Sequence, residues 1–562
     1  MSKRLELVWP EKDKVLLGLD NNGKPIWGTK ADLETRLLVQ LEAVGETNPD
    51  NLNDLYEQGD NLLIKGDNLL ALKALERHFA GRIKCIYIDP PFNTGNAFEY
   101  YDDGLEHTIW LSMMKARLEI LRKLLREDGA IFVEIDDTEQ AHLKVLMDEV
   151  FGRPNYVLSV AVKRSAATGH KAINPSPINV CEFIHIYARN KNKWRYIQQS
   201  VSREGYDWAY NCVVPNMDES FPGWKFASLS DVVAKELGFE DAKQARKTMG
   251  KNNLENAMVD FALKHSDIVI RFAQPNYGGV SQAARDMIDE SKVKVDEVLC
   301  LRRKDYSDMY FYRGNRILFL HDKVQEDEEG NQIVEPLTNF WDDIPWQGIA
   351  KEGGVDFPKS KKPEKLIRRI LEISTGKHDW VLDSFVGSGT TAAVAHKLGR
   401  KWVGVEIGEH AETLCLPRLK RVVSGEDQSG ISKQVGWKGG GSFRYCVLGE
   451  SLFDKDEDTG LVMINPKYTN GPLVAAVCNL EGFYLNNDSL FHGTQGNTYA
   501  HITEDKVTQA YLDVLEEKLP EGKNLAVYCL KHAASLELSD NVKIKRIPRE
   551  LSIPRYLRGI LQ

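Results

Sequence analysis

The sequence predicts an α/β fold. Residues 83–88 form an apolar run with the length of a buried strand, and the double proline at 90–91 ends it. Residues 380–398 have the pattern of a strand, a Gly-rich turn and a helix, and residues 401–407 that of another strand. The run 107–127 spaces its apolar residues along one face of a helix. Elements in this order are typical of a parallel sheet covered by helices.

The tetrad Asp89-Pro90-Pro91-Phe92 is the candidate catalytic centre. Asp89 falls at the carboxyl end of its predicted strand, where open α/β folds bind ligands. The prolines fix φ and lack an N–H, so their carbonyls, particularly that of Pro90, are acceptors without a donor beside them. Two acceptors that hold an exocyclic amine favour its pyramidal, nucleophilic form, and Phe92 offers a flat face to an extruded base. The alternative interpretation is a simple Asp-Pro-Pro turn.

A Gly-rich turn at 385–389 is the candidate cofactor site. Gly387 and Gly389 lack the Cβ atoms that would keep a ligand away from the backbone, and the N–H groups of the next helix can receive a carboxylate. Glu406 follows about twenty residues on, where dinucleotide-type folds place a carboxylate on the ribose hydroxyls. A nicotinamide dehydrogenase would share this pattern, but it would not explain Asp-Pro-Pro-Phe.

On these residues the chain resembles the S-adenosylmethionine-dependent DNA amino-methyltransferases, and within them the adenine-N6 enzymes. Residues 89–92 match the family's Asp-Pro-Pro-Tyr motif with Phe for Tyr, and residues 385–389 match its Phe-x-Gly-x-Gly motif. The catalytic motif precedes the cofactor motif, which is the circularly permuted order of the β class. The resemblance implies a Rossmann-like methyltransferase fold, S-adenosylmethionine as cofactor, and methyl transfer to N6 of a flipped adenine in double-stranded DNA.

The resemblance also assigns site residues. Segment 128–137 looks like the strand after the catalytic motif, and segment 357–367 looks like the one ahead of the cofactor motif, although it begins Phe-Pro-Lys instead of the usual His-Pro-Thr. The predicted catalytic residues are Asp89, Pro90, Pro91 and Phe92. The predicted cofactor-binding residues are Asp67, Phe357, Ser360, Lys362, Asp383, Phe385, Gly387, Gly389, Thr390 and Glu406. Asp67 has an alternative role, because such residues also cap helices. No metal is predicted.

Four further segments, 63–72, 93–96, 340–344 and 436–444, look like the modification (Mod) subunits of type III restriction-modification systems. The likeness is weakest between 190 and 335, where target recognition would lie. It implies a homodimer, a prokaryotic cytoplasmic enzyme associated with the nucleoid, and a restriction (Res) subunit as possible partner. Because the chain has no Gly-x-x-x-x-Gly-Lys-Ser/Thr loop, ATP-driven cleavage would belong to that separate subunit.

These anchors predict five domains and one linker. The domains are an N-terminal arm (1–58), a catalytic part (59–190), an inserted target-recognition domain (191–335), a cofactor-binding part (336–423) and an α+β C-terminal docking or dimerisation domain (431–562). The linker is the polar, Gly-containing stretch 424–430. Helices are predicted over 30–43 and 229–248.

The formal net charge of −9 means that contacts to DNA phosphates must come from local basic clusters. The candidate DNA-binding residues, which lie in or beside the predicted recognition region, are Lys163, Arg164, Lys171, Arg302, Arg303 and Lys304. The eight cysteines contain no Cys-x-x-Cys pair, which argues against a zinc site or a disulfide framework. No apolar run approaches membrane length.

Several alternative functions use the same patterns. Cytosine-N4 methylation needs the same scaffold, but those enzymes usually carry Ser where this chain has Asp89. An orphan adenine methyltransferase would lack the restriction partner. Methylation of RNA or protein amides fits the permuted order and the large insertion less well, and a non-catalytic DNA-binding scaffold would not need two intact chemical motifs.

Overall fold

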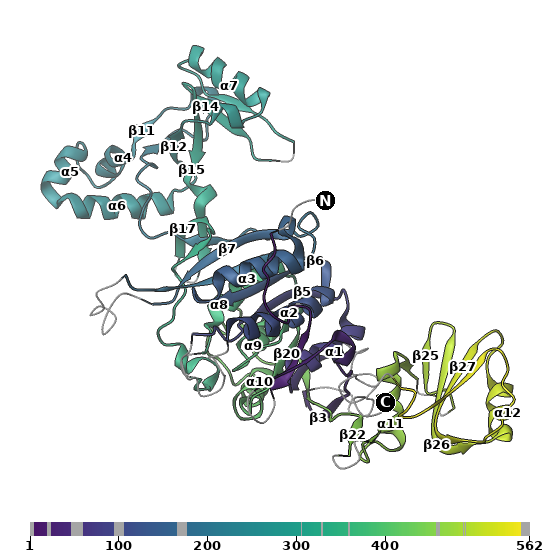
Figure 1. Ribbon diagram of the computed structural model, residues 1–562. Coiled ribbons are helices and arrows are strands. Elements are labelled where there is room, and N and C mark those ends of the chain that lie inside the picture. The colour runs from purple at the N-terminus through teal and green to yellow at the C-terminus, as the bar shows by residue number, and fades with distance from the viewer. Residues whose placement is uncertain are drawn as a thin grey trace. The chain divides into compact units, whose positions relative to one another are not determined.

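The computed structural model describes residues 5–19, 24–45, 60–94, 106–165, 177–304, 306–327, 330–357, 360–456, 461–486, 488 and 490–551. The chain divides into two compact units (Figure 1). One unit comprises Met1–Ile197 together with Asn339–Gln562, and the other is Gln198–Thr338. Among the helices of the described residues, none has the length and apolar character needed to cross a membrane.

A ten-stranded mixed sheet is the centre of the first unit, in the order β18-β7-β8-β6-β5-β19-β20-β4-β21-β3. The strands are β3 (Leu38–Gly45), β4 (Asn61–Lys65), β5 (Ile83–Ile88), β6 (Leu125–Ile135), β7 (Tyr156–Lys163), β8 (Cys181–Ala188), β18 (Phe340–Trp341), β19 (Trp380–Asp383), β20 (Lys401–Glu406) and β21 (Ser442–Leu448). The run from β6 to β21 is parallel, as the sequence predicts. β8 runs antiparallel to β6, and β3 antiparallel to β21.

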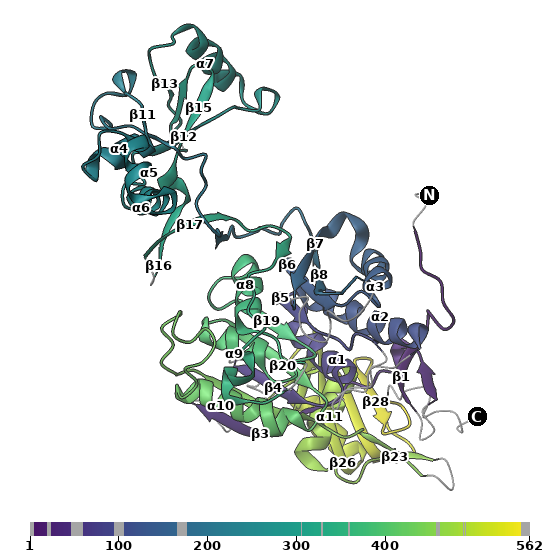
Figure 2. The ribbon, with the colours of Figure 1, turned by 90° about the vertical axis from the view of Figure 1, so that its left-hand side faces the viewer.

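Two groups of helices cover opposite faces of this sheet (Figure 2). One group is α1 (Asn68–Phe79), α2 (His107–Leu124) and α3 (Gln140–Met147), and the other is α8 (Glu364–Ser374), α9 (Thr390–Lys397) and α10 (Leu416–Ser424). Every residue of β5 is buried, as expected for a strand covered on both faces. Because β5, β19 and β20 are parallel neighbours, the Asp-Pro-Pro-Phe and Gly-rich motifs lie side by side at their carboxyl ends.

Two predictions at the borders of this unit are wrong. The predicted helix 30–43 is a short turn at Lys30–Asp32 followed by β3, because Val39 to Val44 pair with β21 in the same sheet. The predicted linker 424–430 packs against the fold through Asp427 and Ser429, and β21 then enters the sheet between β4 and β3. The arm and the segment after the linker therefore both contribute strands to the main sheet.

The second unit, Gln198–Thr338, contains two antiparallel sheets and four helices within its described residues. The larger sheet, in the order β11-β10-β12-β15-β14-β13, consists of β10 (Cys212–Val213), β11 (Ala227–Ser228), β12 (Val269–Ala273), β13 (Leu299–Leu301), β14 (Met309–Tyr312) and β15 (Asn315–Phe319). The helices are α4 (Leu229–Glu236), α5 (Ala242–Met249), α6 (Lys251–Lys264) and α7 (Gln282–Val293). The predicted helix 229–248 is two helices, because Gly238 leaves the helical region with φ +85°.

The chain enters and leaves this unit through paired strands. β9 (Ser200–Ser202) pairs antiparallel with β17 (Gly330–Pro336), which also pairs with β16 (Val324–Asp327). The Leu337 N–H donates to the Gln199 carbonyl over 3.1 Å. The second and the second-to-last residues of the unit are thus hydrogen-bonded to each other.

The C-terminal part of the first unit has its own apolar clusters. Its elements are β22 (Phe453–Lys455), β23 (Val462–Ile464), α11 (Asn470–Glu481), β24 (Tyr484–Leu485), β25 (Gly493–Gln495), β26 (Thr498–Val507), α12 (Gln509–Lys518), β27 (Asn524–His532) and β28 (Val542–Arg546). The last five strands form one sheet. The Arg77 guanidinium on α1 lies 3.6 Å from the centre of the Tyr484 ring, which ties this part to the main sheet.

Candidate active site

The carboxyl edge of the sheet carries most of the predicted site residues. Asp89 follows β5, and Asp383 and Glu406 are the last residues of β19 and β20. A cavity of about 40 Å³ lies at this edge. Eight predicted residues line it, together with Tyr87, Val386, Ser388 and Thr391: they are Asp89, Phe357, Ser360, Lys362, Asp383, Phe385, Gly387 and Thr390. The fold therefore brings the residues around Asp89 and the Gly-rich turn to one place.

The Gly-rich turn needs its glycines. Gly387 and Gly389 have φ values of +54° and +83°, in the left-handed region that favours glycine. A Cβ atom at Gly389 would also lie 2.7 Å from the Cys415 sulfur, closer than real atoms approach. Helix α9 begins immediately afterwards at Thr390, so its first N–H groups lie beside the cavity.

Glu406 and Asp67 are engaged within the chain. The Glu406 carboxylate accepts hydrogen bonds from the N–H groups of Gly387 (2.9 Å), Ile407 (2.9 Å) and Gly408 (3.0 Å), so it holds the Gly-rich turn in place. Asp67 caps helix α1 by accepting from the Leu70 N–H over 3.0 Å, which is the alternative role that the sequence left open. Neither side chain lines the cavity.

Asp383 is a buried carboxyl at the cavity wall. It accepts from the Thr391 hydroxyl (2.6 Å) and from the Phe385 N–H (2.9 Å). Burial raises the pKa of Asp383 to about 7, against these two hydrogen bonds, and the nearby carboxylates of Asp89 and Glu406 add to the increase. A cationic ligand in this cavity would stabilise the ionised form of Asp383.

Lys362 connects the catalytic motif to two further carboxylates. Its ammonium lies 3.2 Å from Asp89 Oδ1, 3.0 Å from Glu134 Oε1 and 3.1 Å from Glu182 Oε2. Glu134 lies on β6, Glu182 lies on β8, and both are buried. Burial lowers the pKa of Lys362, but the three carboxylates outweigh it and hold its pKa above the ordinary value. Lys362 is therefore a charged group in the site.

The carboxyl groups of Asp89 and Glu134 have higher pKa values than solvent-exposed carboxyl groups. Burial raises the pKa of Asp89 to about 6; Lys362 opposes this shift and Glu182 adds to it. Burial likewise raises the pKa of Glu134 to about 8, where the Tyr87 hydroxyl donates to its second oxygen. Asp89 therefore takes up a proton at a higher pH than an exposed aspartate does.

The rest of the tetrad is anchored by its neighbours. The Trp110 indole N–H donates to the Pro91 carbonyl over 2.8 Å. Asn93, with φ +63°, donates to Glu139 over 2.8 Å, and the imidazoles of His107 and His142 contact the same carboxylate. The ligand-type atoms of Glu139 and the two histidines lie within 4.8 Å of one another.

A larger cavity of about 440 Å³ adjoins this region and shares Phe357 with the smaller one. Its other lining residues are Asp136, Arg164, Ser165, Asn179, Val180, Cys181, Glu182, Trp346, Gly348, Ile349, Ala350, Asp356 and Lys361. Glu182 links this cavity to Lys362, and the Arg164 guanidinium pairs with the same carboxylate. The cavity presents an aromatic ring and both signs of charge.

The predicted DNA-binding residues lie in both units. Lys163 ends β7, and Arg164 follows it with its guanidinium turned to Glu182. Arg302, Arg303 and Lys304 follow β13 in the second unit, where the Arg303 Nε donates to the Ser307 carbonyl over 2.8 Å. Lys171, and Pro358 and Lys359 of the segment ahead of the Gly-rich motif, lie outside the described residues.

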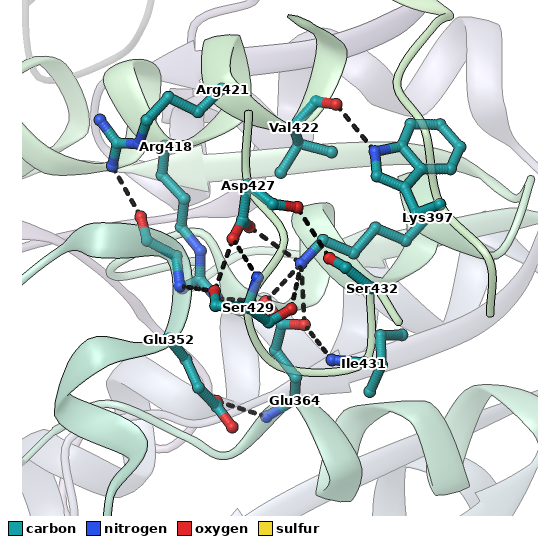
Figure 3. Close-up of polar contacts among 12 residues, drawn as sticks. Glu352, Glu364, Lys397, Arg418, Arg421, Val422, Asp427, Ser429, Ile431 and Ser432 are labelled. Atoms are coloured by element: carbon teal, nitrogen blue, oxygen red, sulfur yellow. Dashed lines mark hydrogen bonds and ion pairs between the residues drawn. The ribbon is translucent and has the colours of Figure 1, made fainter. Parts of the chain in front are cut away.

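A buried ionic network joins Glu364, Lys397, Arg418 and Asp427 (Figure 3). The Lys397 ammonium at the end of α9 lies 3.0 Å from Glu364 and 2.9 Å from Asp427. Arg418 lies 2.8 Å from Glu364 and also donates to the Thr390 hydroxyl over 2.8 Å. The network thereby connects α8, α10 and the segment after α10 to both ends of α9, Thr390 and Lys397.

Sequence reasoning missed several partners of the site: the half-buried Trp346 and the buried residues Glu134, Glu182, Glu364, Lys397 and Arg418. One signal was available: Glu134 interrupts the apolar strand Ile131-Phe132-Val133-Glu134-Ile135, and a charged residue there must find a partner. The partner Lys362 lies far along the chain, so the pairing itself has no local signature.

Comparison with known proteins adds to this geometry. The family described as DNA methylase matches residues 83–415. A Haemophilus influenzae protein, named as the probable HindVI Mod subunit of a type III restriction-modification enzyme, is 36% identical over 69% of this chain and 54% of its own length. The EcoP15I Mod subunit of Escherichia coli is 26% identical over 65% of this chain and 61% of its own length.

This chain thus spans about half to three-fifths of these relatives. Among solved structures, the PvuII cytosine-N4-specific DNA methyltransferase has a TM-score of 0.32 and 12% identity, over 67% of this chain and 90% of its own. The family match covers more than half of the present sequence and contains the Asp-Pro-Pro-Phe tetrad, the Gly-rich turn and Glu406. The chain therefore belongs to the DNA methylase family.

Proposed function

We propose that this protein transfers the methyl group of S-adenosylmethionine to N6 of a flipped adenine in double-stranded DNA, as the modification subunit of a type III restriction-modification system. The observation that carries the proposal is the placement of Asp89 and the Gly-rich turn around one cavity at the carboxyl edge of the sheet. The names of the Mod relatives support the assignment to a type III system.

The residues of the smaller cavity fit the cofactor. The N–H groups that open α9 can receive a carboxylate, the Asp383 carboxyl can receive an ammonium group, and Phe385 and Phe357 give apolar contact. S-adenosylmethionine, when bound, supplies an electrophilic methyl group. Asp67 and Glu406 act indirectly in this assignment, through the α1 cap and the Gly-rich turn.

The catalytic tetrad would hold the target base. Asp89 accepts a hydrogen bond from the exocyclic amine, the Pro90 carbonyl accepts the second, and the Phe92 ring stacks on the base. Positioning of this kind lowers the barrier mainly by fixing the attacking nitrogen in line with the methyl group. As the amine forms its new bond to carbon, it gives up one proton, for which Asp89 is the adjacent acceptor.

Binding partners follow from the same assignment. The second unit, Gln198–Thr338, would recognise the target sequence, and Lys163, Arg164, Lys171 and the cluster Arg302, Arg303 and Lys304 would contact phosphates. A homodimer, a role of the C-terminal part in docking or dimerisation, a separate ATP-dependent Res subunit and association with the nucleoid in a prokaryotic cytoplasm complete the proposal.

The test is transfer of labelled methyl from S-adenosylmethionine to unmethylated genomic DNA, with the modified base identified by mass spectrometry and its sites mapped by sequencing. We expect N6-methyladenine on one strand of one short asymmetric motif. N4-methylcytosine would keep the fold and overturn the substrate. Methylation without a partner gene in the same operon would favour an orphan enzyme, and no transfer to DNA would refute the proposal.

A further inference from the structure

The environment of Lys362 points to a role other than cofactor binding. Three carboxylates from three neighbouring strands surround its ammonium: Asp89 after β5, Glu134 on β6 and Glu182 on β8, all within 3.2 Å. A lysine that held the carboxylate of a bound cofactor would not need three carboxylates of its own chain. The head group is turned toward the catalytic motif.

Two of these carboxylates have a second partner, so the cluster is a connected structure. The Tyr87 hydroxyl donates to the other oxygen of Glu134, and Arg164 pairs with the other oxygen of Glu182. The Glu134 side chain is 0% exposed and the Glu182 side chain is 2% exposed, so both depend on neighbouring groups of the chain. Buried polar and charged groups are stable only where such pairing offsets their lost hydration. The lysine is therefore held at a fixed point relative to β5, β6 and β8.

The same ammonium lies against the aromatic residue of the tetrad. Its distance to the centre of the Phe92 ring is 4.9 Å, and that to the Trp346 ring is 5.7 Å. A cation over one face of a ring is attracted by the ring quadrupole. Lys362 thus contacts the Phe92 ring as well as the Asp89 carboxyl group.

Asp89 presents its two oxygens to different surroundings. Oδ1 is the atom that faces Lys362 at 3.2 Å. The structure assigns the remaining oxygen, Oδ2, to the amine, because an acceptor already facing an ammonium is a poorer acceptor for a second donor. Fixing one oxygen also fixes the plane of the carboxyl group and so the direction of the other.

We propose that Lys362 is a positioning residue that fixes Asp89 and Phe92 together, with Glu134 and Glu182 holding the lysine in place. This inference rests on the proposed methyl transfer. It replaces the sequence-based assignment of Lys362 to cofactor binding, and it predicts that loss of the lysine reduces the transfer rate and leaves cofactor affinity unchanged.

The experiment compares three full-length variants, Lys362→Met, Lys362→Arg and Glu182→Gln, with the full-length wild-type protein on DNA that carries the target motif. Single-turnover rates are measured at saturating S-adenosylmethionine and DNA, and cofactor affinity is measured separately by calorimetry. We expect Lys362→Met to slow transfer on the order of 10²-fold, the scale of a misplaced reacting group, with cofactor affinity within about twofold. Lys362→Arg should recover part of the rate, because it restores the charge.

Lys365→Met is the matched control, since Lys365 lies three residues further on, is 44% exposed and pairs with Asp343 outside the site. Its rate and affinity should equal those of the wild type. If Lys362→Met fails to fold, as judged by its thermal transition, Glu182→Gln serves in its place: it keeps the lysine, removes one anchor and should slow transfer with unchanged cofactor affinity.

Two results would overturn the inference. A Lys362→Met enzyme that binds the cofactor poorly but reacts at the wild-type rate when saturated would make Lys362 a cofactor ligand. A variant with unchanged rate and affinity would leave it no role in the reaction. A wild-type protein that transfers no methyl group to any DNA would instead refute the proposed function itself, so the two failures are distinguishable.

Discussion

The Thr391 hydroxyl on α9 donates to Asp383 Oδ2 at the end of β19 over 2.6 Å, so the strand and the helix are tied directly across the Gly-rich turn. The carboxyl that makes this link is buried, and its pKa is raised to about 7 from 3.8. Between these two values the folded protein binds a proton that the unfolded chain releases. The stability contributed by this group is therefore highest at acidic pH and falls as the pH rises from about 4 to 7.

We predict that Asp383→Asn stabilises the ligand-free protein at pH 8 by roughly 1–3 kcal/mol. The amide oxygen can accept from the Phe385 N–H and the amide nitrogen can donate to the Thr391 hydroxyl, so both contacts persist without a buried charge. Urea unfolding at pH 5, 6.5 and 8 measures the difference, which should shrink toward pH 5. Destabilisation of equal size at all three pH values would contradict ionisation of the buried Asp383 carboxyl group in this pH range.

The buried ionic network of Glu364, Lys397, Arg418 and Asp427 gives a second prediction. Glu364→Gln should destabilise the protein by about 3–5 kcal/mol, because Lys397 and Arg418 lose a shared buried partner. Glu372→Gln on the same helix is the matched control: its pair with Arg368 is partly exposed and should change the free energy of unfolding by less than about 1 kcal/mol. Urea unfolding measures both variants. Equal losses in the free energy of unfolding would mean that burial does not make the ion pairs of the network stronger than exposed ones.

The catalytic motif gives a third prediction. Asp89→Ala should abolish methyl transfer while calorimetric affinity for S-adenosylmethionine and DNA affinity in gel-shift assays stay near wild-type values, as expected for a group that acts mainly in the transition state. Removing Asp89 also leaves Lys362 between two carboxylates, so the fold should persist. An unfolded variant would favour the interpretation of Asp-Pro-Pro as a structural turn.

The basic cluster of the second unit gives a fourth prediction. Replacing Arg302, Arg303 and Lys304 together with Ala should weaken binding about equally for target and non-target DNA. The slope of log affinity against log salt concentration is negative, and it should become less steep by about 0.9 for each phosphate that the variant no longer neutralises. Ala at Lys292 and Lys294 is the control, because these side chains pair with Asp289 and Glu290. An unchanged slope in the triple variant would remove this cluster from the DNA interface.

The sequence was sufficient for those parts of the molecule that have a local pattern. The buried strand 83–88, its Asp-Pro-Pro end and the strand-turn-helix at 380–398 all coincide with observed elements. The local pattern failed at 30–43, where the spacing of the leucines resembles that of a helix. From Leu38 onward these residues form the edge strand β3, because β21, which lies far along the chain, is available to pair. Tertiary pairing overrides local propensity in such cases.

The buried ionic partners could not be predicted for a related reason. Glu364, Lys397, Arg418 and Asp427 come from three helices and a loop, and each is an ordinary charged residue in its own segment. The polar stretch 424–430 looked like a linker because composition does not distinguish solvated charge from paired, buried charge. These charges become paired and buried only when α8, α9 and α10 come together in the folded protein.

The paired strands at the base of the second unit have a consequence for how such enzymes diversify. Gln199 and Leu337 are joined by a backbone hydrogen bond, so the whole insertion starts and finishes at nearly one point. A replacement module of any size would have to close the same short gap, and the entropic cost of closing it grows only slowly with length. Recombination at two chain positions can therefore exchange the whole second unit, for which we propose target recognition, while the strands that carry Asp89 and the Gly-rich turn stay as they are.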